Sequence, residues 1–176
     1  MDFQKTTGGV LMPTTIKVGG VFHVEHMREG RLIDEFECPN LVVNEGLNSI
    51  LGIMFHADTQ ISTWYLGLFE GNYTPVAGLT AATVTSASTE CTAYDEAARV
   101  AYNEAAAASQ SITNSANKAT FTINATKTIY GAFLVSASAK SATTGTLFSA
   151  ARFASAKSVV ATDQLLLTYT FTASSV

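Results

Sequence analysis

The chain has 176 residues, of which 47% are hydrophobic and 14% are charged, and it is long enough for one domain with a substantial core. About a quarter of the residues in a typical soluble domain are charged, so this composition indicates a chain that shares much of its surface with partner proteins. No apolar run approaches the roughly 18 residues that a membrane-spanning helix needs, and the N-terminal residues lack the order of a signal peptide. We therefore expect no membrane association.

The net charge of −4 is unevenly distributed along the chain. Residues 1–40 carry −2, residues 41–104 carry −6 and residues 105–176 carry +4. Segments of opposite sign either complement one another across an interface, or belong to a chain whose two ends fold together. The basic residues of the last segment are scattered, at Lys118, Lys127, Lys140, Arg152 and Lys157. Because they form no cluster, we expect no nucleic-acid partner.

Residues 1–20 contain two Gly-Gly pairs, a proline and several threonines, which is typical of an extended arm without a core of its own. The apolar residues of this arm, among them Val10, Leu11 and Ile16, would gain from contact with a neighbouring protein. The arm therefore either docks on another subunit or is a frayed terminus. We expect residues 21–176 to form a single β-rich domain.

Residues 21–36 have the pattern of a β-hairpin with its turn at residues 29–31. A two-residue loop would place two arginines opposite each other across the turn, which is unfavourable. A three-residue loop would instead place Glu25 opposite Glu35, which is also a like-charge pair. We favour the three-residue loop.

A short helix is predicted over residues 44–57, after an extended run at residues 41–43. Asn44 is a good N-cap residue, and Glu45 would lie favourably in the first turn. Apolar residues recur at helical spacing on one face, at Leu47, Ile50, Leu51, Met54 and Phe55. Because glycines within the segment weaken the helix, we expect the packing of this face to hold it in place.

Residues 64–69 form a predicted strand that is apolar on both faces, which indicates a central and well-covered position in a sheet. Residues 77–118 are a weakly patterned connector. Within it, the alanines at 105–108 are compatible with a helix, but their Ser and Asn neighbours favour a loop or short turn. We expect Asp95 or Glu96 to form a surface ion pair with Arg99, worth at most about 1 kcal/mol.

The last third of the chain has a strong strand signal. Strands are predicted at residues 120–123, 128–136, 146–153 and 165–171, with a turn at residues 143–145. Several strands separated by polar turns favour a mainly β fold. We expect an antiparallel β-sandwich or jelly-roll-like domain with one short helix and the extended N-terminal arm.

The histidines do not indicate a metal site. His23 and His26 are three residues apart in a predicted strand, so their side chains point to opposite faces of the sheet. Glu25 shares the face of His23, but one imidazole and one carboxylate are too few ligands. His56 lies at the end of the predicted helix, where a cation is favourable.

Other chemistry is equally sparse. The chain lacks the Gly-x-Ser-x-Gly, phosphate-loop and HExxH motifs, so the sequence predicts no catalytic, cofactor-binding or metal-binding residues and no enzyme. Cys38 and Cys91 are far apart in the sequence, and we expect two small buried or half-buried thiols. Aromatic residues are the candidates for a binding surface, although most should lie in the core: Trp64, Tyr73, Tyr94, Tyr102 and Tyr130.

Seven segments follow one another in a distinctive order between residues 21 and 173. They are Phe22-His23-Val24-Glu25, Asn40-Leu41-Val42-Val43-Asn44-Glu45-Gly46-Leu47, Trp64-Tyr65-Leu66-Gly67-Leu68, Thr120-Phe121-Thr122-Ile123-Asn124-Ala125-Thr126, Gly131-Ala132-Phe133-Leu134, Gly145-Thr146-Leu147-Phe148-Ser149-Ala150 and Leu167-Thr168-Tyr169-Thr170-Phe171. In this order they resemble a family of small structural proteins of tailed bacteriophages.

The resemblance implies a virion component, most simply a capsid decoration or cement protein on the exterior of the head, assembled in the cytoplasm of a bacterial host. Its partners would be the major capsid protein and further copies of itself. The resemblance concerns strand-forming segments, so it transfers no catalytic or binding positions. The alternative is a neck, tail or fibre component of the same virion, with a partner-binding or host-binding role.

Overall fold

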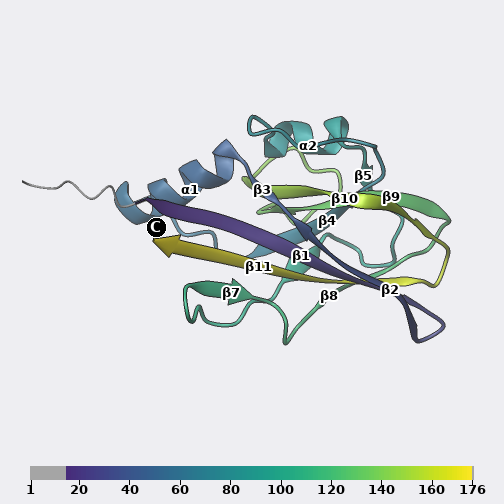
Figure 1. The fold of residues 1–176 in the computed structure, drawn as a ribbon. Coiled ribbons are helices and arrows are strands. Elements are labelled where there is room, and N and C mark those ends of the chain that lie inside the picture. The colour runs from purple at the N-terminus through teal and green to yellow at the C-terminus, as the bar shows by residue number, and fades with distance from the viewer. Residues whose placement is uncertain (1–14, 176) are drawn as a thin grey trace, which may run out of the picture.

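A computed structural model describes residues 15–175 of the chain, and two antiparallel β-sheets dominate it (Figure 1). The first sheet has the strand order β2-β1-β11-β7, and β8 also pairs with β11. Its strands are β1 (Ile16–Arg28), β2 (Arg31–Pro39), β7 (Ser111–Thr113), β8 (Ala119–Thr122) and β11 (Gln164–Ser175).

The second sheet has the order β3-β10-β9-β4-β5, and β6 also pairs with β4. Its strands are β3 (Leu41–Val42), β4 (Trp64–Phe69), β5 (Glu90–Cys91), β6 (Val100–Tyr102), β9 (Lys127–Val135) and β10 (Leu147–Val159). Two helices, α1 (Asn44–Phe55) and α2 (Ala81–Ala87), complete the described part of the chain. The predicted antiparallel β-sandwich is therefore confirmed, with one more helix than expected.

The main core lies between the two sheets. It is built from alternate residues of each strand, because successive side chains of a strand point to opposite faces. The first sheet contributes Phe22, Val24, Phe121, Leu165, Leu167 and Tyr169, all of which are buried. The second sheet contributes Leu66, Leu68, Ile129, Leu134 and Phe153.

A second core covers the other face of the second sheet. Here α2 packs against the strands through Val84, and Phe69 of β4 and Phe133 of β9 are fully buried beneath it. Both faces of the second sheet are therefore covered, which explains why the sequence of β4 is apolar on both of its faces. The prediction of a central, well-covered strand at residues 64–69 is confirmed, with β4 lying between β9 and the short strands β5 and β6.

The hairpin of β1 and β2 combines both of the predicted loop geometries. Its tip is a two-residue turn at Glu29 and Gly30, both with positive φ, and it pairs the flanking strand ends. A bulge at His26/Met27 then shifts the register, so that Glu25 lies opposite Glu35. A positive φ at both turn residues matches the right-handed twist of the strands. The bulge supplies the extra residue that the three-residue loop would have provided.

The N-terminal arm and the connector differ in part from the prediction. Residues 1–14 lie outside the described part of the chain, and residues 16–20 belong to β1 and pair with β11. The connector at residues 77–118 holds α2, β5, β6 and β7, which the sequence did not reveal. Residues 105–108 form a loop, as their polar neighbours indicated.

The first turn of α1 links three elements through a single carboxylate. The helix spans Asn44–Phe55, and Val43 rather than the predicted Asn44 occupies the N-cap position, where it makes no side-chain cap. Glu45 Oε2 instead accepts hydrogen bonds from the backbone N–H groups of Ala81 and Leu147, at 2.8 Å and 2.7 Å. These residues are the first of α2 and of β10, so Glu45 fixes where both elements begin.

The main core makes a direct prediction about stability. Leu66→Ala should lower the free energy of unfolding by about 2–5 kcal/mol, because it leaves a cavity beneath a fully buried side chain. Leu51→Ala, the same change at an exposed helical position, should cost no more than about 0.5 kcal/mol. Urea unfolding of both variants checks this. Equal losses would contradict the assignment of β4 to the core.

Candidate functional site

The most unusual surface feature is the apolar face of α1. Leu51, Met54 and Phe55 are 56%, 66% and 78% exposed, although they occupy the positions that the sequence assigned to a core-facing stripe. That part of the helix prediction is wrong. Residues at this spacing lie on one helical face, so the three side chains form a single apolar patch that the described chain leaves uncovered. We call it the α1 patch.

The reason for this exposure is how α1 rests on the sandwich. Gly46 is the buried residue of the helix, and a Cβ atom built there would lie 2.3 Å from the carbonyl oxygen of Phe148 in β10. The helix therefore sits on the sandwich through its N-terminal end, where only a glycine fits. Ile50 packs against the edge of the main core, and the following turn extends beyond it.

A pocket of about 240 Å³ opens between α1, the segment before β4 and the ends of β10 and β11. Its walls are largely aromatic, and Ile50 contributes the side of α1. The aromatic lining residues are Trp64, Tyr102, Phe148, Tyr169 and Phe171. Because Ile50 lies four residues before Met54, the two side chains share a face of α1, and the pocket and the α1 patch are neighbouring parts of one apolar region.

The aromatic residues that the sequence offered for binding divide into two groups. Tyr94 and Tyr102 are buried, and their burial raises the pKa of both phenols above the usual range. They belong to the core, as expected of most of the set. Trp64 is half-buried at the pocket, and Tyr73 and Tyr130 are half-buried against the second core. Trp64 is thus the one member of that set that is both accessible and part of the apolar region.

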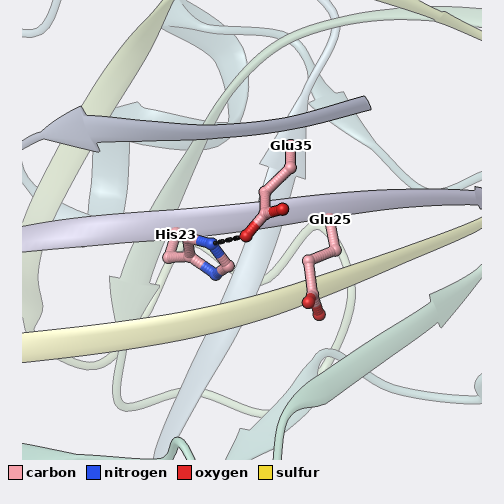
Figure 2. A group of neighbouring side chains, drawn as sticks. All are labelled: His23, Glu25 and Glu35. Atoms are coloured by element: carbon pink, nitrogen blue, oxygen red, sulfur yellow. Dashed lines mark hydrogen bonds and ion pairs between the residues drawn. The ribbon is translucent and has the colours of Figure 1, made fainter. Parts of the chain in front are cut away.

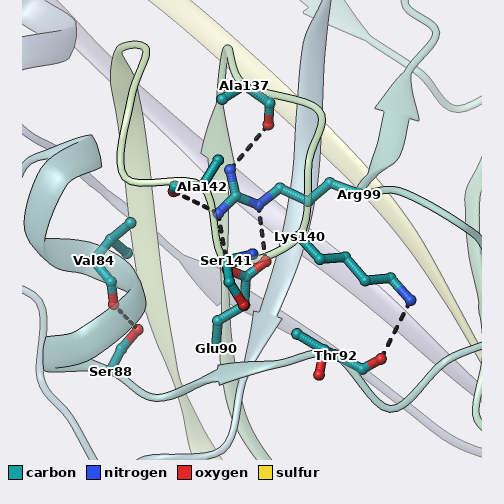
Figure 3. A network of polar contacts seen from close by, with 9 residues as sticks. All are labelled: Val84, Ser88, Glu90, Thr92, Arg99, Ala137, Lys140, Ser141 and Ala142. Atoms are coloured by element: carbon teal, nitrogen blue, oxygen red, sulfur yellow. Dashed lines mark hydrogen bonds and ion pairs between the residues drawn. The ribbon is translucent and has the colours of Figure 1, made fainter.

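The largest polar network lies around Arg99 and is structural (Figure 3). The prediction that Arg99 pairs with Asp95 or Glu96 at the surface is wrong. Its guanidinium instead forms a bidentate ion pair with Glu90, with both N···O distances at 2.8 Å and both side chains almost fully buried. It also donates to the carbonyl oxygens of Ala137 and Ala142, at 2.9 Å and 3.1 Å.

This network joins two loops that are distant in the sequence. Glu90 accepts a further hydrogen bond from the backbone N–H of Ser141, at 2.9 Å, so the loop after β9 is held on both sides. The Arg99 guanidinium also lies over the ring of Phe133, 5.3 Å from its centre. Asp95 and Glu96 have other partners, because they accept hydrogen bonds from Asn124 and from the backbone N–H of Thr122.

A second charged cluster fixes the turn between β10 and β11. Asp163 is fully buried and accepts two hydrogen bonds from Arg28, at 2.8 Å and 2.7 Å. It also contacts Nε2 of His26, at 2.8 Å, and accepts a hydrogen bond from the backbone N–H of Val160. Hydrogen bonding by the Arg28 guanidinium holds the pKa of the Asp163 carboxyl well below its usual range. His26 therefore has a structural role.

His23 lies on the opposite face of β1 from His26, as the sequence predicted. On this outward face it contacts Glu35 of β2, with Nε2 and Oε1 2.7 Å apart, and it lies near Glu25. The register favoured from the sequence also places Glu35 opposite Glu25, and the structure shows that Glu35 completes a group of three potential metal ligands. His56 follows the last residue of α1 and is exposed, close to its predicted position.

Both cysteines are buried and form no disulfide bond, in agreement with the sequence. Burial raises the pKa of the Cys91 thiol to about 11 and also raises that of Cys38. A thiol that stays protonated at neutral pH is a poor nucleophile and a poor metal ligand. The two residues therefore serve as small core side chains.

The uneven charge along the chain is compensated within one molecule. Lys118 binds Glu25, Lys127 binds Glu70 and Lys157 binds Asp34, so basic residues of the last third meet acidic residues of the earlier segments. Of the two explanations for the charge distribution, the structure favours a chain whose two ends fold together. Pairing between early and late strands is the reason for this arrangement, because β1 pairs with β11 in the first sheet and β4 pairs with β9 in the second.

Almost all buried polar groups of residues 15–175 are engaged within the fold. Only Asn40 Oδ1 and the Tyr94 hydroxyl have no hydrogen-bond partner among the buried side-chain atoms described.

No helix in this part of the chain is both long and apolar enough to cross a membrane. Comparison with known proteins adds no relative, since no family model and no curated protein matches the chain. Because the polar clusters are engaged within the fold and the apolar face of α1 is uncovered, the α1 patch and its pocket are the candidate site.

The Arg99 network predicts a strong asymmetry between buried and surface ion pairs. Arg99→Met should lower the free energy of unfolding by about 3–5 kcal/mol, because it leaves Glu90 buried without its partner. Lys127→Met, which breaks the partly exposed pair with Glu70, should cost no more than about 1 kcal/mol. Denaturant unfolding of the two variants measures the difference. Comparable costs would show that Glu90 reaches solvent.

The Asp163 cluster predicts a pH dependence of stability. The folded-state pKa of Asp163 lies below its ordinary value of 3.8, so its contribution is fully present above that value and is lost as the pH falls towards the folded-state pKa. The stability difference between the unaltered chain and Asp163→Asn should therefore shrink as the pH falls from about 5 to about 2. Thermal unfolding across this range tests it, and a constant difference would contradict it.

Proposed function

We propose that this chain is a non-enzymatic virion structural protein, a capsid decoration or cement protein that binds and stabilises the lattice of a phage major capsid protein. The observation that carries the proposal is the α1 patch. A protein that functions as a soluble monomer rarely exposes three large apolar side chains together on one helical face. Such a face is typical of a surface that becomes covered on assembly.

The free energy available from this patch supports an interface. Burial of a Leu, Met or Phe side chain contributes about 1.5–3 kcal/mol, so covering the patch would favour association by several kcal/mol. A stable interface buries at least about 1,000 Å², however, which is more than three side chains provide. The neighbouring pocket wall at Trp64 and Phe171, and surfaces rich in small uncharged residues, supply the remaining area.

The construction of the domain suits a bracing role. Two sheets packed face to face and the ion-pair networks of Glu90 and Asp163 hold the sandwich as one packed unit, and rigid packing transmits load without local rearrangement. The segments that resemble phage structural proteins form parts of β1, β4, β8, β9, β10 and β11 and the start of α1. We take that resemblance, together with the uncovered patch, as the basis for placing the chain on a capsid.

Copy number separates a cement protein from a neck, tail or fibre component of a virion. A cement protein is present in numbers comparable to those of the major capsid protein, whereas a neck or fibre protein makes up a small fraction of that number. Quantitative mass spectrometry of purified virions and of emptied heads measures this ratio. A low ratio, or absence from emptied heads, would favour the neck, tail or fibre alternative.

The α1 patch can be tested on heads assembled without the protein. The triple variant Leu51→Ser, Met54→Ser and Phe55→Ser should stay folded, because these residues are exposed, but should bind heads at least about tenfold more weakly. It should also fail to raise the temperature at which heads rupture, since mass action links occupancy to stabilisation. Co-sedimentation and thermal release of DNA provide the two measurements.

Val76→Ser is the matched control, because Val76 is 55% exposed but lies in the loop between β4 and α2. Its neighbour Ala77 accepts a hydrogen bond from Asn44 at the N-terminus of α1, whereas the α1 patch lies towards the other end of the helix. This variant should decorate and protect heads as the unaltered chain does. If the triple variant also decorates heads normally, α1 is not the docking face. If heads without the protein withstand heat equally well, the cement proposal itself fails.

A further inference from the structure

Three side chains with metal-binding atoms meet on the outward face of the β1–β2 hairpin (Figure 2). His23 and Glu25 lie two residues apart on β1 and therefore share a face. Glu35 lies on β2 directly opposite Glu25, as the bulge-shifted register requires. One ligand atom from each residue can be chosen so that all three lie within 4.8 Å of one another.

We propose that His23, Glu25 and Glu35 bind a divalent transition-metal ion, of which Zn²⁺ is the representative. One imidazole and two carboxylates are ligands that zinc accepts, and the imidazole disfavours Mg²⁺ and Ca²⁺, which prefer oxygen ligands alone. Three protein ligands leave a further position for water. This inference is independent of the proposed function, because it concerns the outward face of the first sheet and not the α1 patch.

The arrangement of charges around these residues favours a cation. Two glutamates directly opposite each other on neighbouring strands repel, and Glu37 lies opposite His23 on the same face. Among residues 15–175, Lys118 is the one lysine or arginine that forms an ion pair with the group, with Nζ 2.6 Å from Oε2 of Glu25. The Glu35 carboxylate forms a hydrogen bond only with the imidazole of His23 among the described side chains. A metal ion would neutralise both carboxylates at once.

Only small side-chain movements are needed to form the site. Zinc bonds of about 2.0–2.2 Å place tetrahedral ligand atoms about 3.4 Å apart, which is wider than the 2.7 Å between His23 and Glu35 but narrower than the 4.8 Å range of the whole group. In Figure 2, the carboxylate of Glu35 points towards His23, whereas no contact joins that of Glu25 to either residue. Closure therefore requires Glu25 to rotate and to exchange Lys118 for the metal. The side chain of Lys118 is 36% exposed, so it can return to solvent.

Calorimetric titration of the full chain with ZnCl₂ tests the proposal. The chain should bind one equivalent, and saturating Zn²⁺ should raise the unfolding temperature, an increase that EDTA reverses. His23→Asn and Glu35→Gln should each weaken binding at least about tenfold, since even residues that only support a ligand have effects of that size. Circular dichroism and the unfolding temperature without metal verify that each variant is folded.

Two further variants make the test specific. His56→Asn removes the other exposed histidine of the described chain and should leave binding unchanged. Lys118→Met removes the cation that competes for Glu25 and should strengthen binding. The proposal is overturned if the unaltered chain binds no Zn²⁺ at millimolar concentration, or if His23→Asn and Glu35→Gln bind as the unaltered chain does. Equal loss in His56→Asn, or no gain in Lys118→Met, would also overturn it.

Discussion

The antiparallel pairing of β1 with β11 is the constraint on which the rest of the structure depends. It runs from Ile16 opposite Ser175 to Met27 opposite Gln164 and so joins the first and last described strands. The buried Asp163 carboxylate, bound by Arg28 and His26, fixes one end of this ladder. Because loop closure between such distant segments costs entropy, this ladder forms only together with the core that it encloses. It also brings Glu25 of β1 into contact with Lys118 of the basic segment.

This pairing decides which residues face outward. With Phe22 and Val24 in the core, the intervening His23 and Glu25 must lie on the solvent face of the first sheet. The bulge in the hairpin then selects Glu35 as the neighbour of Glu25. The one-residue bulge thus changes which acidic residue of β2 lies opposite Glu25. This change brings together a set of metal-ligating side chains. The proposed metal site follows from strand register alone.

The exposure of α1 has a comparable architectural cause. The second sheet meets the first sheet on one face and α2 on the other, so both of its faces are already covered. A further amphipathic helix finds room only at the end of the sandwich, where Gly46 permits close contact and Glu45 accepts hydrogen bonds from two neighbouring elements. The apolar face beyond Ile50 is left for a partner. The hydrogen bonds of Glu45 thus attach α1 to the sandwich, whereas the apolar residues of the helix form the candidate site.

Local pattern was sufficient to predict the elements with strong periodicity. The strands at 120–123 and 165–171 follow from the alternation of apolar residues, the strand at 64–69 from its apolar character on both faces, and the helix from residue 44 from apolar residues at helical spacing; together these elements predict the sandwich fold. The sequence also placed His23 on the face of Glu25, and the favoured hairpin register placed Glu35 opposite Glu25. Tertiary structure alone decided that Leu51, Met54 and Phe55 face solvent and that Arg99 pairs with a buried Glu90. Each of these depends on register or packing between segments distant in the sequence, which no local pattern of residues encodes.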